Sequence, residues 1–480
     1  MVWYLDEELA LTVIDQALML GADYVEARFH EKKAETIALK NGELEPIIRH
    51  MEKGVATRIL VDGAMGLATT NLVTEASVLE AVEKAAKLAK AASRLMDEKI
   101  EFSPVETYDV EYTAVEKRPW VNTDLDEKIG LLRDIDKGLE DGSELKIGFP
   151  SRLLELSHIW EKKLLVNSTG TSILSAIPRT GAHYLLTGAT DGKTIQRMGQ
   201  IGGAVGWEIM EDKDLEGVIA SDAKAMERML LKGTSPPTEE VDVVVAPEVS
   251  GIIVHEAIGH PSEADRILGR EAAQAGESYM EPDSLGRRIG SEATFVSDDP
   301  TIPGSYGYYL YDDEGVKAGK RVLIEEGGIK SFLHNRQTAA KLNVESNGSA
   351  RAMSYSVEPI VRMANTYFEA GDHAFSELLE DIHLGVYFKS FMEWNIDDKR
   401  VNQRYTGLES YMIRDGELAE PVRNPMIETT TEELLGKLDA RGNDLRFWAA
   451  TCGKGDPSQG APVWAGGPHL RFRGIRLGSR

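Results

Sequence analysis

A chain of 480 residues is too long for one ordinary hydrophobic core, so we expect two or three domains. Its apolar fraction of 42% and charged fraction of 28% are those of a globular protein and argue against extensive disorder. The formal net charge of −25 repels phosphate backbones, so the composition argues against nucleic acid as a general partner.

The first segment is expected to be an amphipathic helix over residues 6–20. Asp6, Glu7 and Glu8 stand in its first turn, where acidic side chains favour the helix dipole and where a secretory signal would carry basic residues. No apolar run approaches the ~20 residues needed to cross a bilayer. A single cysteine cannot form an internal disulfide, which agrees with a reducing compartment. We therefore expect a cytoplasmic protein without a membrane partner.

The segment after Gly21 alternates apolar and polar residues, which predicts an antiparallel meander of strands. The expected turns are Asn41-Gly42, Gly54 and Asp62-Gly63. Helices are expected over residues 74–97, with Thr74 as the cap, and over 124–140 and 214–232, with strands between 144 and 199. The stretch GTSPPTEE at 233–240 has no periodicity, so we place a domain boundary near residue 238.

The second half opens with an apolar, β-branched run over residues 241–249, which leads directly into the segment HEAIGH. Further strands are expected at 320–326, 357–364, 384–396 and 469–478. The fold class is therefore expected to be α+β. An N-terminal α/β domain over residues 1–238, with antiparallel sheet and long helices, precedes a mainly antiparallel β domain over residues 239–480.

The segment HEAIGH, residues 255–260, carries the strongest local indication of chemistry. A zinc peptidase needs neutral imidazoles that hold the ion and a carboxylate that takes a proton from water. In the common HExxH motif the two histidines lie one helical turn apart, whereas this spacing puts His260 roughly 140° around a regular helix from His255. Gly259 and Pro261 favour a distortion, either a π-type bulge or a helix end at His260. The motif alone leaves both a metal site and a structural pair of histidines open.

A catalytic zinc site usually has three protein ligands and one open position. The candidates for the third ligand are Glu263, Asp265 and Cys452. Glu263 follows His260 by three residues and could serve if the helix resumes. Cys452 lies in AATCGKGDPSQG, which we expect to be a tight, exposed loop. Thiolate is the softer and stronger zinc ligand, but the residues alone leave Glu263 and Cys452 both open.

Several further motifs follow HEAIGH along the chain. They are Asp312-Asp313-Glu314-Gly315; Arg362, Met363, Asn365 and Thr366; Cys452-Gly453-Lys454 followed by Gln459; and the closing segment LRFRGIRLG at 470–478. With these motifs the chain resembles the TldD/PmbA family of peptidases, specifically its TldD-like, HExxxH-bearing branch, over nearly its whole length.

The resemblance implies a zinc metallopeptidase in which His255, His260 and Cys452 hold Zn²⁺ and Glu256 is the general base. It implies an N-terminal domain for dimerisation and the substrate cavity, followed by a β-rich domain that holds the metal. Unfolded peptides would enter the enclosed cavity and bind as an added strand. The chain would pair as a homodimer, or as a heterodimer with a related non-catalytic subunit. Pro261 and the residues 456–458 depart from the family pattern and leave the loop geometry open.

Two other functions stay open. The chain could be mainly a peptide-binding or partner subunit whose catalysis requires a second chain. Cys452 could instead be the nucleophile of a cysteine hydrolase, which predicts inactivation by alkylation and indifference to chelators. The acidic run at 312–315 is expected to be a solvated turn rather than a cation site. Arg362 could hold a substrate carboxylate or pair with one of the many acidic side chains, and its role is left unassigned. The glycine cluster at 199–206 fits no nucleotide-binding motif.

Overall fold

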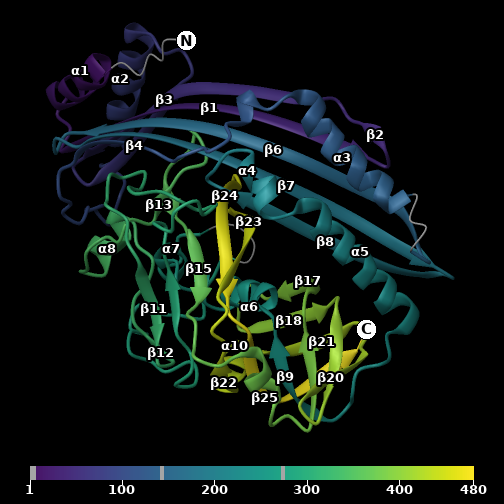
Figure 1. The fold of residues 1–480 in the computed structure, drawn as a ribbon. Coiled ribbons are helices and arrows are strands. Elements are labelled where there is room, and N and C mark those ends of the chain that lie inside the picture. Colours follow the sequence, from purple (N-terminus) through teal and green to yellow (C-terminus); the bar gives the residue numbers. More distant parts are fainter. Residues whose placement is uncertain (1–6, 141–144, 272–275, 480) are drawn as a thin grey trace.

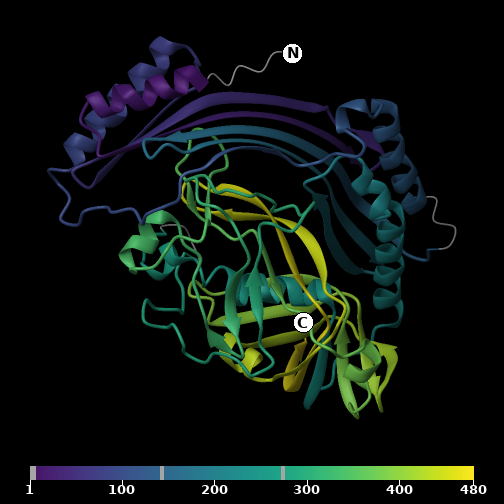
Figure 2. The ribbon, with the colours of Figure 1, turned by 60° about the vertical axis from the view of Figure 1, so that its left-hand side comes forward.

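The computed structural model describes residues 7–140, 145–271 and 276–479 of the chain. It is a mixed α and β structure with mainly antiparallel sheets, as the sequence predicted. An eight-stranded sheet built from residues 24–203 arches over the second half, whose sheets are built from residues 240–479 (Figure 1, Figure 2). The boundary predicted near residue 238 falls between these two groups of strands, and the division into two domains stays a prediction.

The first sheet has the strand order β4-β3-β1-β6-β7-β5, with β2 paired to β1 and β8 paired to β7. Its strands are β1 (Tyr24–Lys40), β2 (Glu43–Leu44), β3 (Ile48–Val61), β4 (Ala64–Thr70), β5 (Asp109–Thr113), β6 (Gly148–Asn167), β7 (Ser172–Thr190) and β8 (Lys193–Gly203). The predicted turns at Asn41-Gly42 and Asp62-Gly63 are present, with positive φ at each residue. The turn predicted at Gly54 is wrong, because β3 runs through it. Glycine serves close packing there, since a Cβ would lie 2.4 Å from the ring of Tyr355.

Helices cover the outer side of this sheet in two pairs (Figure 2). They are α1 (Glu7–Met19), α2 (Glu75–Ala92), α3 (Leu125–Glu140) and α5 (Leu215–Lys232), with the short η1 (Trp120–Asn122) and α4 (Glu208–Asp212). One apolar core joins α1 and α2 to β1, β3 and β4, and a second joins α3 and α5 to β6, β7 and β8. The four predicted helices are confirmed, and Thr74 caps α2 by accepting a hydrogen bond from the amide of Ser77. Asp6 lies outside the described residues.

Two larger sheets of the second half enclose helix α6. One has the order β12-β11-β10-β15-β24-β23; the other has the order β17-β18-β21-β25-β9-β16-β19-β20, with β22 paired to β25; β13 and β14 form a separate pair. Apolar side chains of α6, such as Val249 and Ile253, share one core with residues of both sheets. The strand predicted over 357–364 is wrong except at its centre, where β14 forms.

The bounds of these elements are β9 (Glu240–Val245), β10 (Val296–Asp298), β11 (Arg321–Glu325), β12 (Gly328–Ile329), β13 (Ala350–Arg351), β14 (Ile360–Val361), β15 (Asn365–Phe368), β16 (Leu384–Phe388), β17 (Phe391–Ile396), β18 (Asn402–Gly407), β19 (Ser410–Arg414), β20 (Glu417–Pro421), β21 (Pro425–Thr430), β22 (Leu438–Arg441), β23 (Arg446–Lys454), β24 (Gln459–Gly467) and β25 (Leu470–Ser479). The helices are α6 (Pro247–Val254), the π turn η2 (His255–Gly259), α7 (Ala264–Ile267), α8 (Arg336–Lys341), α9 (Phe375–Leu379) and α10 (Thr431–Gly436).

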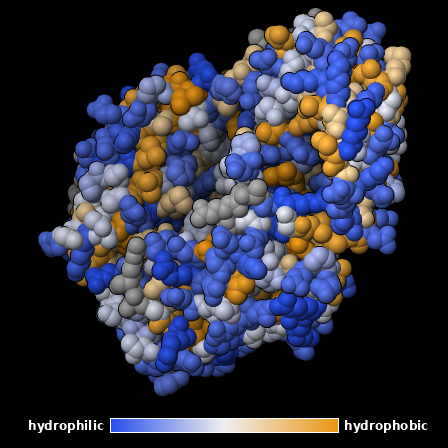
Figure 3. Space-filling view, turned by 180° about the vertical axis from the view of Figure 1, so that it is seen from behind, coloured by the Kyte–Doolittle hydropathy of each residue, from blue (hydrophilic) through white to orange (hydrophobic). Residues whose placement is uncertain are grey.

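One face of the molecule is mainly hydrophilic. Figure 3 shows the face opposite to that of Figure 1, on which apolar residues are scattered among polar ones and which is hollowed near its centre. Within the described ranges, every helix is too short or too polar to span a membrane.

Candidate metal centre

Helix α6 ends in a wide turn that carries both histidines of HEAIGH. In this π turn the amide of His260 donates a hydrogen bond to the carbonyl oxygen of His255 at 3.1 Å. Gly259 lets Met363 pack against the turn, because a Cβ on Gly259 would lie 2.0 Å from the Met363 sulfur. The extra residue in the turn brings the two imidazoles together, with ring centroids 4.8 Å apart. The π-type distortion predicted from the motif spacing is therefore confirmed.

Cys452 reaches these imidazoles from strand β23, which forms a hairpin with β24. It stands opposite Ala461 in the hairpin. The exposed loop predicted here is wrong: Cys452 lies in the strand and is 5% exposed, and the turn follows it at residues 455–458. Arg362, which the sequence left without a role, donates hydrogen bonds to the carbonyl oxygens of Cys452 and Gln459. This guanidinium therefore holds the two strands of the hairpin at the position of the thiol.

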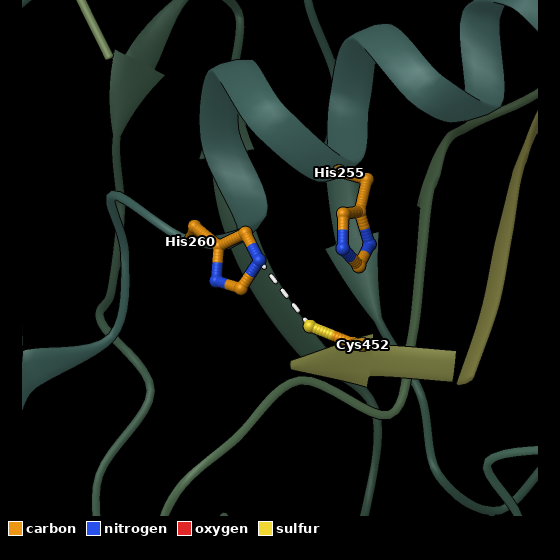
Figure 4. Close-up of side chains that lie close together, drawn as sticks. All are labelled: His255, His260 and Cys452. Atoms are coloured by element: carbon orange, nitrogen blue, oxygen red, sulfur yellow. Dashed lines mark hydrogen bonds between the residues drawn. The ribbon is translucent and has the colours of Figure 1, made fainter. Parts of the chain in front are cut away.

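His255, His260 and Cys452 lie close enough to share one metal ion (Figure 4). One ligand atom of each lies within 4.8 Å of the others, and Sγ of Cys452 lies 3.2 Å from Nε2 of His260. All three side chains are buried. Among the described residues, Nδ1 of His255 has no hydrogen-bond partner, although buried polar atoms normally have one. Two imidazoles and a thiolate are donors that zinc prefers, so the residues present fit a zinc ion.

The charges around the sulfur favour the thiolate. Burial alone would raise the pKa of the Cys452 thiol, but the imidazoles of His260 and His255 and the guanidinium of Arg362 lower this pKa well below its usual value. Burial would lower the pKa of His255, and the neighbouring sulfur raises it instead. The thiolate is the form of cysteine that binds metals, so the environment prepares Cys452 for that role.

A cluster of buried charges behind His260 orients its ring. Nδ1 of His260 lies 3.0 Å from the carboxylate of Glu263, which leaves Nε2 facing the thiol. Arg266 donates to the same carboxylate at 2.6 Å, and the Lys454 ammonium lies 3.1 Å from it and 2.6 Å from Asp265. Burial would raise the pKa of Glu263, but Lys454, His260 and Arg266 hold it well below its usual range. Glu263 and Asp265 thus lie behind the histidine, outside the group of three donors.

Glu256 follows the first histidine and lines the same cleft. Its carboxylate accepts a hydrogen bond from the indole of Trp394 at 3.1 Å and lies 3.4 Å from Nε of Arg400. These two donors fix the orientation of the carboxylate. Trp394 belongs to β17 and Arg400 to the loop after it, so no residue pattern near HEAIGH indicated either of them.

The site lines a cleft of about 1090 Å³ between the first sheet and the second half. Residues 197–202 of β8 form one wall, and residues 445–453, mainly of β23, form another. β23 is the last strand of its sheet, so its backbone offers an edge to the cleft. His255, Glu256, His260 and Cys452 all line this cleft. The four residues singled out in the sequence are thus brought together, and their catalytic roles remain a proposal.

The acidic run at residues 312–315 is not a solvated turn, as the sequence had predicted. Its carboxylates are buried, and the first accepts three backbone amide hydrogen bonds. Asp313 pairs with Lys163 at 3.1 Å and Glu314 with Arg58 at 2.6 Å. The run therefore joins the second half to the first sheet through partners that are distant in the sequence.

Comparisons with known proteins give the same family along most of the chain. Three family models match: PmbA/TldA metallopeptidase domain 1 at residues 25–89, the central domain at 118–231 and the C-terminal domain at 238–479. A metalloprotease of Methanocaldococcus jannaschii is 32% identical over 96% of this chain and 98% of its own length. A zinc metalloprotease TldD homolog of Saccharolobus solfataricus is 27% identical over 97% of this chain and 98% of its own.

Among solved structures, TldE of Thermococcus kodakarensis has the same fold. The TM-score is 0.75 at 17% identity, and the match covers 98% of this chain and 100% of that one.

Proposed function

Because the chain belongs to the PmbA/TldD metallopeptidase family, we propose that it is a zinc-dependent peptidase whose metal is held by His255, His260 and Cys452. The observation that carries this proposal is the buried group of two imidazoles and one thiolate that lines the cleft. Three protein ligands are the usual number at catalytic zinc sites, which keep one position open. The name of the Saccharolobus relative, a zinc metalloprotease, supports the choice of metal.

In the proposed mechanism a zinc ion would supply Lewis-acid activation of water and of the scissile carbonyl. Glu256 moves the proton: its carboxylate takes a proton from the attacking water and passes it to the leaving amine as the C–N bond breaks. Trp394 and Arg400 hold the carboxylate in place through their hydrogen-bonding groups. Glu263 keeps His260 in the orientation that directs Nε2 to the cysteine.

The proposed substrates are unfolded peptides or protein segments. The free edge of β23 runs along the cleft beside Cys452, so an extended peptide could pair with it through main-chain hydrogen bonds. This mode of binding needs an exposed backbone, which the interior of a folded protein does not offer.

The rival mechanism is that of a cysteine hydrolase, in which Cys452 would be the nucleophile, because a thiolate next to an imidazole is also a nucleophilic pair. Such an enzyme needs one imidazole as its base, whereas Cys452 lies beside two, and Glu256 would have no role. The two mechanisms differ in their response to chelation: a metallopeptidase loses activity and regains it with zinc, and a cysteine hydrolase does neither.

Elemental analysis of gel-filtered protein beside a Cys452→Ala variant tests the metal site. We expect about one zinc per chain in the wild type, and a much weakened content in the variant. A Glu256→Gln variant should keep its zinc and lose peptide hydrolysis. If the wild type holds no zinc even after supplementation, the peptidase proposal fails for this chain alone, and the role of a peptide-binding partner subunit takes its place.

A further inference from the structure

A second cavity, of about 230 Å³, adjoins the cleft on the other face of the β23–β24 hairpin. Thr451 and Pro462, which pair across the hairpin, line it. Because side chains alternate along a strand, the side chains of Thr451 and Pro462 point to the face opposite to that of Cys452. Ala461, the cross-strand partner of Cys452, also lines the cavity. Ile159, Tyr306 and Thr451 line both the second cavity and the cleft, so the two spaces are neighbours.

Cationic groups outnumber carboxyl groups around the second cavity. Five of its lining side chains are cationic, Lys32, Lys163, Arg179, Arg351 and Arg362, and three carry a carboxyl group. The whole chain has the opposite balance, with 54 Lys and Arg against 79 Asp and Glu. Buried positive charge is costly unless a negative group compensates it, so this local excess calls for a partner.

The three carboxyl groups of the cavity are already engaged. Glu161 lies 3.1 Å from the guanidinium of Arg179, and Asp313 lies 3.1 Å from the ammonium of Lys163. The third carboxyl group, that of Asp312, accepts its hydrogen bonds from backbone amides. Asp313 acts on Arg351 only as a neighbouring charge, and none of the three forms an ion pair with Arg351 or Arg362 among the described contacts.

Arg351 and Arg362 have only neutral partners in the part of the chain that the structure describes. They are 9% and 1% exposed. Arg351 donates to the carbonyl oxygens of Met363 and Pro462 at 2.8 and 2.9 Å, and Nε of Arg362 is buried without a partner. Burial, together with the positive charges of Arg179 and Arg362, lowers the pKa of Arg351 to about 10. A planar guanidinium that is buried without an ion-pair partner suits a carboxylate, which it can bind through two hydrogen bonds.

We propose that the second cavity is a substrate subsite that binds a carboxylate, and that Arg351 recognises it. This inference rests on the proposed peptidase function, since the ligand is part of the peptide. The carboxylate comes from an acidic side chain or from the C-terminal carboxyl group. Neighbouring side chains of an extended peptide point to opposite sides. If one residue of the bound peptide points to the same face as Cys452 of β23, the next peptide residue points to the same face as Thr451, where the second cavity begins.

Matched peptides test the subsite. Decapeptides of Ala and Ser carry one Glu or one Gln at successive positions, each with a free or an amidated C-terminus. We expect the wild type to prefer the carboxylate at one position by about 10- to 100-fold in kcat/KM, the range of a hydrogen bond to a charged group. A Glu effect identifies a side chain as the source, and an amidation effect identifies the C-terminus.

Three variants locate the preference. Arg351→Gln should lose the ratio between charged and uncharged peptides, and Arg351→Lys should keep part of it. Arg446→Gln is the matched control, because it removes an arginine that lines the cleft and not the second cavity. That variant should keep the full ratio. If Arg351→Gln keeps the wild-type ratio of kcat/KM between charged and uncharged peptides, the assignment of Arg351 to the carboxylate is overturned.

Peptide binding separates this inference from the peptidase proposal. Fluorescence anisotropy of the same peptides on a Glu256→Gln variant reports affinity without cleavage. If the wild type cleaves no peptide but binds the carboxylate form more tightly, the peptidase proposal fails and the subsite stands. If the Glu and Gln peptides, and the free and amidated forms, bind and are cleaved equally, the subsite is refuted whatever the activity. The comparison on unaltered Arg351 does not depend on how its variants fold.

Discussion

Replacement of Glu263 by Gln is expected to weaken zinc binding without removing a zinc ligand. The amide has the size of the carboxylate but no charge, and its NH2 group, which does not accept a hydrogen bond, can face Nδ1 of His260. The carboxylate of Glu263 lies 3.0 Å from that nitrogen and 2.6 Å from Nε of Arg266. Its loss frees the imidazole to turn, so Nε2 is no longer held toward Cys452.

The magnitude follows from two contributions. Loss of the outer group that orients a ligating histidine costs about 10- to 100-fold in metal affinity. Removing one partner of a buried ion pair costs about 3–5 kcal/mol of stability. We expect the lower end of that range, about 3 kcal/mol, because Asp265 remains 2.6 Å from the ammonium of Lys454 and continues to compensate it.

Zinc affinity is measured by competition with a chromophoric chelator, and stability by urea unfolding. The matched control is Glu26→Gln, which removes another buried carboxylate, 3% exposed and paired with Arg58 at 2.9 Å, away from the metal site. The control should lose stability and keep the wild-type zinc affinity. If Glu263→Gln behaves in the same way, with zinc affinity unchanged, the orienting role of Glu263 is refuted.

Three further predictions concern the turn, the pH dependence and the assembly. Gly259→Ala places a Cβ 2.0 Å from the Met363 sulfur, so we expect a loss of about 1–3 kcal/mol and weaker zinc binding; an unchanged melting temperature would contradict the packing of this turn. Burial, together with the positive charge of Lys128, lowers the pKa of His158 from 6.5 to about 4. Between these two pH values the unfolded chain binds a proton at His158 and the native state does not. The contribution of His158 to the free energy of unfolding is therefore full above pH 6.5 and falls by about 3 kcal/mol as the pH decreases to about 4. Urea unfolding across this range should show a smaller loss of stability in His158→Phe than in the wild type. An identical pH profile of the two proteins would count against the assignment. Light scattering should give a dimer mass, either for the chain alone or after mixing with a related subunit, and a monomer under both conditions would contradict the predicted pairing.

Local pattern was sufficient for most of the secondary structure. The helices at α2, α3 and α5 follow from periodic apolar residues, and the cap at Thr74 from a hydroxyl at the first turn. The π turn was also predictable, because the cause of the distortion lies within the motif and its neighbours, Gly259 and Pro261. The wrong turn at Gly54 has a distant cause, the ring of Tyr355, which the pattern around residue 54 does not contain.

The sequence by itself determined which chemical groups were available: two imidazoles at a spacing that needs a wide turn, a carboxylate between them and a single thiol. It also indicated the family, through motifs spread along the chain. It left Glu263 and Cys452 both open as the third donor on residue chemistry alone. Only the tertiary structure brings Cys452, 192 residues after His260, to 3.2 Å from it and turns Glu263 to the other side of the ring.

The same limit explains the two predictions about exposure that were wrong. Cys452 and the acidic run at 312–315 look like loop residues, yet both are buried, one in the hairpin with β24 and the other against Lys163 and Arg58 of the first sheet. Backbone preferences act over a few neighbouring residues, and a sequence pattern records them directly. Burial and ligand geometry depend on segments that fold together from distant parts of the chain, so the tertiary structure alone decided them.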